Sequence, residues 1–198
     1  MGKGATTRQT ILEHAAGVAS ATGLEGLTIG SLAADLNLSK SGLFAHFRSK
    51  EALQQSVLDA AAAHFTSAVV RPALAQPRGK ARLKAIFEGW LSWAQSEVGP
   101  GGCIFVAAAV ELDDRPGRVR DHLVALQKNW LDCIARVAGT AIATGEFAPK
   151  TDPEQMAHDL YGIMLSYHHA SRLLEDPQAE RRARRAFAAL MLAAAAKN

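Results

Sequence analysis

The stretch Thr28–Phe47, TIGSLAADLNLSKSGLFAHF, decides the fold of the N-terminal part of the chain. Its apolar residues recur at three- and four-residue steps, which predicts two short helices that each turn one face inward. The inward residues are expected to be Ile29, Leu32, Ala33, Leu36, Leu43 and Phe47, with Leu38 at the corner. Thr28 and Ser39 can cap the two helices because their hydroxyls accept free backbone N–H groups. Asn37 tolerates the left-handed conformation that a sharp turn between them needs.

Two short helices with a tight turn are typical of a helix-turn-helix that reads DNA. The first helix of such a motif crosses the phosphate backbone, and the N-terminal residues of the second reach base edges in the major groove. The second helix here turns small or polar residues outward, namely Lys40, Ser41, Gly42, Ala45 and His46. Lys40 and Ser41 can hydrogen-bond base edges or phosphates. A plain helical hairpin within a bundle core is the alternative.

The flanking segments favour the DNA-reading alternative. Ser49-Lys50-Glu51 follows directly and is expected to begin another helix. Its free N–H groups, the positive end of its dipole and Lys50 would together hold a phosphate. Upstream, Thr7–Thr22 has the pattern of an amphipathic helix that ends at Gly23, and this helix would complete a three-helix unit.

The run GLFAHFRSKEAL, Gly42–Leu53, together with Thr28 and Leu32-Ala33, resembles the signature of TetR-family transcriptional regulators. The resemblance covers about residues 7–55. The family usually carries Tyr where this chain has Phe44, and often Gly at the turn where it has Asn37-Leu38. The residues that the pattern and the resemblance together assign to DNA binding are Thr28, Ser39, Lys40, Ser41, Gly42, Phe44, Ala45, His46 and Lys50.

The composition indicates an all-α protein. The chain has 198 residues, 48% of them hydrophobic, with many alanines and little strand alternation. We expect a helix-turn-helix DNA-binding domain over residues 1–50 and a larger helical ligand-binding and dimerisation domain over residues 51–198. The net charge of +3 is compatible with nucleic acid without arguing for it. No signal-peptide core or membrane-length apolar run is evident, so a cytoplasmic protein without membrane contact is expected.

The C-terminal helices are expected to form a dimer interface. One long helix is predicted from Ser49 to about Val70, ended by Arg71-Pro72, and another from Asp113 to about Thr144. The helix after Thr151-Asp152-Pro153-Glu154 is apolar on two faces, and the last helix, after Asp176-Pro177, is rich in alanine. A helix that is apolar on two faces must be buried on both. We therefore expect these last two helices to form a four-helix bundle with their symmetry mates, an arrangement that the resemblance also implies.

The resemblance further implies a pocket for an unidentified small-molecule effector among the central helices. Large aromatic side chains with a few polar tips suit an apolar ligand. The candidates are Trp90, Phe105, Trp130, Met164, Tyr167 and His168, for each of which an ordinary core role is the alternative. No cofactor and no metal site are expected. Cys103 and Cys133 have no CxxC partner, which favours structural thiols over a redox sensor.

The pattern and the resemblance together thus imply a homodimeric regulator, a repressor, that binds a palindromic double-stranded DNA operator and, as in the family it resembles, releases it on binding the effector. Two alternatives stay open. One is a helical ligand-binding or scaffolding protein whose N-terminal unit does not read DNA, for which Phe44 in place of Tyr is the support. The other is an enzyme, which no G-x-S-x-G, H-E-x-x-H or Gly-rich phosphate loop supports.

Overall fold

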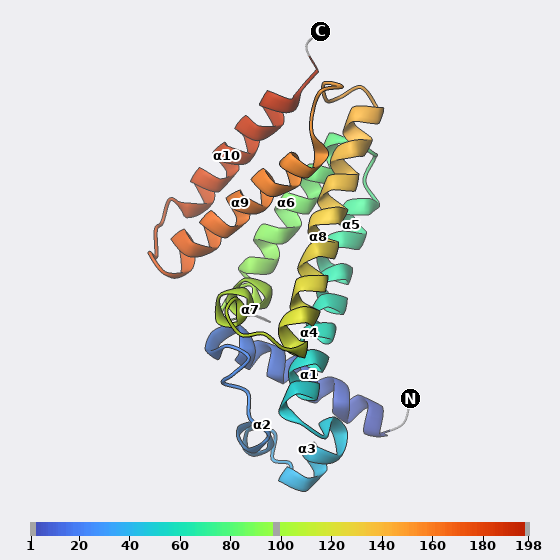
Figure 1. The fold of residues 1–198 in the computed structure, drawn as a ribbon. Helices are drawn as coiled ribbons and strands as arrows, with labels where there is room; N and C mark the ends of the chain where they lie inside the picture. Colours follow the sequence, from blue (N-terminus) through green and yellow to red (C-terminus); the bar gives the residue numbers. More distant parts are fainter. Residues whose placement is uncertain (1–2, 97–99, 197–198) are drawn as a thin grey trace. The chain divides into compact units, whose positions relative to one another are not determined.

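The computed structural model describes residues 3–96 and 100–196, in which helices joined by loops make up the regular secondary structure (Figure 1). The β structure recorded in them is an isolated bridge between Phe147 and Ala195. The all-α prediction is therefore confirmed. Contacts divide the chain into two compact units, which are described separately below.

The first unit comprises the described parts of Met1–His64 and Gln95–Ala125. It contains α1 (Lys3–Thr22), α2 (Ile29–Asp35), α3 (Lys40–Phe47), α4 (Lys50–Phe65) and α7 (Ile104–Leu112), and the beginning of α8 (Arg118–Ala143). Its core is apolar and includes Ile11, Leu12, Ala15, Leu24, Leu27, Leu32, Leu43, Phe47, Leu53 and Val57. The alanine-rich run before Leu112 is a helix, as its composition favours.

The second unit comprises Phe65–Ala94 and the described part of Leu126–Asn198. It contains a π-helical turn η1 (Thr66–Val70), α5 (Arg71–Leu74), α6 (Lys80–Ala94), the rest of α8, α9 (Pro153–Arg172) and α10 (Ala179–Ala194). In Figure 1, α9 and α10 lie side by side and run in opposite directions. Phe87 of α6 stacks on Phe187 of α10, with ring centroids 4.3 Å apart.

Three predicted helix ends are wrong. The helical path does not stop at Arg71-Pro72, because the π-helical turn, in which the Arg71 N–H donates to the Thr66 carbonyl, accommodates a proline that lacks an N–H. Helix α8 begins at Arg118 rather than at Asp113, since Pro116 disfavours helical geometry at the residue before it. The helix expected from Thr7 already begins at Lys3.

The start of α9 is capped by Asp152, whose Oδ1 accepts the N–H groups of Glu154 and Gln155 at 2.9 and 3.2 Å. Pro153 follows at the first helical position, where a missing N–H costs nothing. Among the described residues, no helix is both long and apolar enough to cross a membrane. Within the same ranges, no group of three or more His, Cys, Asp or Glu side chains is placed to hold a metal ion.

Candidate nucleic-acid interface

The two helix caps predicted for the helix-turn-helix are present. Thr28 precedes α2 in extended conformation, and its Oγ1 accepts the Ser31 N–H at 3.0 Å. Ser39 precedes α3, and its Oγ accepts the Gly42 N–H at 3.0 Å. Asn37 has a φ of 53°, so it adopts the left-handed conformation that the turn requires. The local sequence therefore specifies where each of the two helices begins.

The inward faces also agree with the pattern, with one exception. Leu32, Ala33, Leu43 and Phe47 are buried, and Ile29 and Leu36 are partly buried. The prediction that the Leu38 side chain fills the corner between the helices is wrong, since 36% of this residue is exposed. The left-handed turn at Asn37 is instead closed by the backbone, because the Leu38 N–H donates to the Ala33 carbonyl at 2.8 Å. The side chain of Leu38 is thus not needed to close the corner.

The outward face of α3 is open along its N-terminal half. Lys40, Ser41, Gly42, Phe44 and Ala45 are exposed, and His46 is partly buried. Phe44 is 53% exposed, so its ring is accessible from this face. Apart from Lys40, Phe44 and His46, this face carries small side chains, so another surface can approach the helix closely.

Lys40 and Lys50 are the two predicted DNA-binding residues that carry an ammonium group. The Nζ of Lys40 would lie 3.8 Å from a Cβ built on Gly30, so the ammonium extends over the beginning of α2, close to Thr28. Lys50 begins α4, behind the Ser49 hydroxyl that accepts the Ala52 N–H at 3.1 Å. The predicted DNA-binding residues therefore occupy the caps of α2 and α3, the open face of α3 and the first turn of α4.

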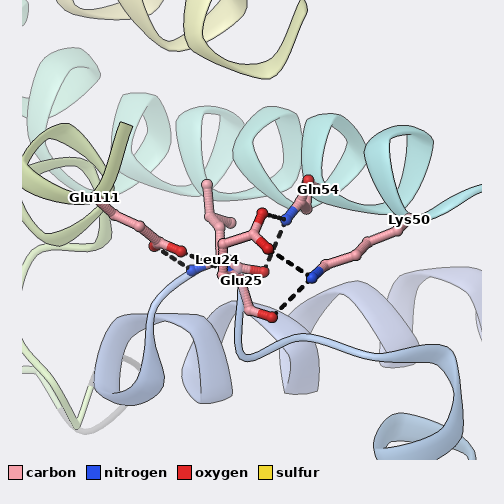
Figure 2. Close-up of polar contacts among 5 residues, drawn as sticks. All are labelled: Leu24, Glu25, Lys50, Gln54 and Glu111. Atoms are coloured by element: carbon pink, nitrogen blue, oxygen red, sulfur yellow. Dashed lines mark hydrogen bonds and ion pairs between the residues drawn. The ribbon is translucent and has the colours of Figure 1, made fainter. Parts of the chain in front are cut away.

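Lys50 has a partner that the sequence pattern did not reveal. Its Nζ donates to the backbone carbonyl and to Oε2 of Glu25, both at 2.9 Å (Figure 2). The Glu25 carboxylate also accepts Gln54 Nε2 at 3.2 Å. These donors lower the pKa of Glu25, Lys50 most and Gln54 next, so the carboxylate is charged at neutral pH. The acid and its donors are 25 and 29 residues apart, and no local periodicity could have paired them.

The six residues predicted to line a ligand pocket lie in both units. Trp90, Met164 and Tyr167 are buried in the second unit, where the rings of Trp90 and Tyr167 meet edge to face at 6.0 Å. Trp130 and His168 are partly buried in the same unit, and Phe105 belongs to the first unit. The structure thus brings Trp90 and Tyr167 into contact, and the pocket itself stays a prediction.

Two of these side chains carry polar ring atoms that are shielded from solvent. Trp130 Nε1 and His168 Nε2 are buried without a hydrogen-bond partner in the described part of the chain. Burial lowers the pKa of His168, as does the positive charge of Arg172, so its ring is neutral near pH 7. Buried polar groups are normally paired. These two atoms are therefore candidates for contact with a bound molecule.

Neither cysteine has the environment of a reactive thiol. Cys103 is buried and Cys133 is partly buried, and neither forms a disulfide bond within the described residues. Burial raises the pKa of Cys133, despite the opposing charge of Arg136, which leaves less of the reactive thiolate at neutral pH.

Comparison with known families assigns both parts of the chain. Residues 11–57 match the family described as bacterial regulatory proteins, tetR family. Residues 79–187 match the family described as tetracyclin repressor-like, C-terminal domain. Comparison with curated proteins gives no match.

Solved structures of transcriptional regulators share the fold over nearly the whole chain. A TetR transcriptional regulator from Chloroflexus aurantiacus is 26% identical, with a TM-score of 0.85 over 97% of this chain and 96% of that one. A TetR-family regulator from Cytophaga hutchinsonii is 23% identical, with a TM-score of 0.88 over 100% and 99%. AibR, solved with isovaleryl coenzyme A and operator DNA, is 22% identical, with a TM-score of 0.68 over 89% and 95%. The two family matches together span the helix-turn-helix and more than half of the chain, and the chain belongs to the TetR family of transcriptional regulators.

Proposed function

We propose that the protein is a homodimeric repressor that places α3 of each subunit in the major groove of a palindromic operator. The observation that carries this proposal is the capped α3, which presents small exposed side chains and Lys40 at its N-terminal half. Base readout by a recognition helix uses this end of the helix. The division of the chain into a DNA-binding part, residues 1–50, and a ligand-binding and dimerisation part, residues 51–198, belongs to this proposal.

Each predicted DNA-binding residue has a role consistent with its position. Lys40 and Ser41 would read base edges from the first turn of α3, and Ala45 would touch a thymine methyl. Gly42 allows close approach, and Ser39 fixes the first turn. The DNA backbone would be held by Thr28 through its hydroxyl, by His46 through its imidazole and by Lys50 through its ammonium group. Phe44 has no hydroxyl and would contact the backbone through its apolar ring.

Lys50 provides a quantitative test of the backbone contacts. Because a phosphate contact carries no sequence information, Lys50→Ala should weaken binding to operator and to unrelated duplex alike. The slope of log K against log salt concentration should also become shallower by about one. An equal loss of affinity with an unchanged slope would contradict the phosphate role of Lys50.

The dimer is proposed to form through α9 and α10. The inner face of α9 is used within the subunit, where Met156, Leu160 and Met164 are buried. A groove along the two helices is lined by small and apolar residues, including Ile163, Ala170, Ala186 and Leu190, together with polar side chains such as His158, Asp159 and Arg182. Small residues let helices approach closely, and a two-fold axis would bring this surface against its own copy. Two subunits arranged in this way fit a two-fold symmetric operator.

The effector is proposed to be a small, largely apolar molecule with at least one hydrogen-bonding group. Trp90, Trp130, Met164, Tyr167 and His168 would supply the second unit's contacts, and Phe105 is a further predicted contact. The unpartnered Trp130 Nε1 and His168 Nε2 would bind the polar group. The descriptions of two structural relatives also name organic molecules: AibR was solved with isovaleryl coenzyme A, and KstR2 of Mycobacterium tuberculosis is described as a ketosteroid transcriptional regulator.

Selection of bound duplexes from a random pool, with purified protein at physiological salt, tests the proposal. A two-fold symmetric consensus bound with an affinity of order 10⁻⁸ M or tighter would support the repressor. Weak binding without a consensus, both with and without added cell extract, would favour the scaffolding alternative. The consensus duplex would then serve as the probe for effectors that release it.

A further inference from the structure

The turn between α1 and α2 is held by a carboxylate from a distant helix. Oε2 and Oε1 of Glu111, on α7, accept the N–H groups of Leu24 and Glu25 at 2.7 and 2.6 Å (Figure 2). Gly23 makes this approach possible, since a Cβ at that position would lie 2.6 Å from Glu111 Oε2. The Glu25 backbone is therefore fixed by α7.

The α1–α2 turn also accepts hydrogen bonds from side chains in the first turns of α4. Besides the two bonds from Lys50 to Glu25, Gln54 Nε2 donates to the Leu24 carbonyl at 2.9 Å. Gln54 is only 3% exposed, so its amide depends on these acceptors. The Glu25 carboxylate is thereby placed on the ammonium that the proposed function assigns to a DNA phosphate.

We propose that Glu25 is an intramolecular competitor of the DNA phosphate for Lys50, and that Glu111 is the positioning residue that keeps Glu25 in place. This inference rests on the proposed phosphate contact of Lys50. An ammonium has three donors, and two of them are committed to Glu25. A phosphate must therefore displace the carboxylate or share the ammonium with it, and either event weakens sequence-independent binding.

The first test is Glu25→Gln, which removes the charge and keeps the shape of the side chain. Exposed ion pairs are weak, so we expect binding to operator and unrelated duplex to tighten by about two- to fivefold at low salt. The salt slope should steepen, by up to about one, because no freed carboxylate then recruits a cation. Glu51→Gln is the matched control: Glu51 adjoins Lys50 in sequence, is exposed, and has no hydrogen bond or ion pair in the part of the chain that the structure describes.

A double-mutant cycle separates competition for Lys50 from general charge repulsion. If Glu25 acts through Lys50, the gain from Glu25→Gln should largely disappear in the Lys50→Ala background, whereas a general effect would persist. Equal gains from Glu25→Gln and Glu51→Gln, or a gain that persists without Lys50, would overturn the inference. If Lys50→Ala alone leaves the salt slope unchanged, the proposed phosphate contact fails instead, so the two failures are distinguishable.

Glu111→Gln tests the positioning role. A glutamine can accept only one of the two N–H groups, so amide hydrogen exchange at Leu24 and Glu25 should accelerate. DNA affinity should also change in the wild-type background, and this change should be lost when Glu25 is already Gln. Faster exchange together with the same change in affinity in both backgrounds would show a merely structural role and refute the assignment.

Discussion

Gly23→Ala tests whether the contact between Glu111 and the α1–α2 turn contributes to stability. The substitution should lower the free energy of unfolding in two separate ways, because Gly23 has a φ of +80° and also adjoins the Glu111 carboxylate. Gly145→Ala is the matched control, since Gly145 has a φ of +74° and a Cβ there would meet nothing within 4 Å. Both glycines follow the end of a helix, and only Gly23 faces a charged side chain.

The expected magnitudes follow from these two environments. A left-handed alanine costs about 1–2 kcal/mol, and the stiffer unfolded chain returns about 0.5–1 kcal/mol of this. Gly145→Ala should therefore lower the free energy of unfolding by roughly 1 kcal/mol. In Gly23→Ala the carboxylate must also move from two N–H groups, one of them exposed, which adds about 1–3 kcal/mol. The total for Gly23→Ala is then about 2–4 kcal/mol.

Urea unfolding measures the stability of both variants, and it is done at one fixed protein concentration because the unfolding midpoint of the proposed dimer would depend on concentration. Far-UV circular dichroism follows the whole chain, whereas the three tryptophans, Trp90, Trp93 and Trp130, all lie in the second unit and report on it by fluorescence. Equal losses for Gly23→Ala and Gly145→Ala would refute a stabilising role for Glu111. As a further check, Glu111→Ala should add little to Gly23→Ala, since the contact is already lost.

Three other perturbations address the Ser39 cap, the proposed dimer and the partly buried His168. Ser39→Ala should lower the free energy of unfolding by about 1 kcal/mol, and Ser39→Asp should not, because only the latter keeps an acceptor for the Gly42 N–H; equal losses in urea would contradict the cap. Ile163→Arg should yield monomers in analytical ultracentrifugation, whereas Leu192→Arg, at a position 77% exposed in a different groove, should leave the dimer intact; a dimeric Ile163→Arg protein would exclude this interface. The pKa of His168 is lowered on folding, so the unfolded chain binds more protons and stability should fall as the pH drops below about 6.5. His168→Asn should flatten the pH dependence of the urea midpoint, and an unchanged profile would show that His168 does not cause it.

The helix-turn-helix was predictable because its signals are local. The caps at Thr28 and Ser39 and the turn at Asn37 each depend on residues within three positions, and the chain forms them where the sequence indicates. The outward residues of α3 follow directly from that register. The face that the proposed function assigns to DNA could thus be deduced without tertiary information.

The links between distant segments could not be deduced in this way. Glu111 lies 86 and 87 positions from its partners, and its side chain is indistinguishable in sequence from a solvated glutamate. The continuation of the helical path past Pro72 likewise depends on a π-helical turn, which has no reliable sequence signal. The pattern of a single sequence indicates which face of a helix is buried. It does not indicate which other helix packs against that face, and the features described here depend on that.

The first unit is built from two separate segments of the sequence, so the ribosome completes one segment before the other. Helices α1 to α4 are synthesised before α7, so the growing chain contains the complete helix-turn-helix while the acceptor for Leu24 and Glu25 is still missing. At about 5–20 residues per second, α7 follows several seconds later. During this interval the α1–α2 turn lacks the Glu111 carboxylate, and Lys50 is not yet held by a fixed partner. A nascent or truncated N-terminal fragment should accordingly bind nucleic acid with less discrimination than the finished chain, and the arrival of α7 would end that state.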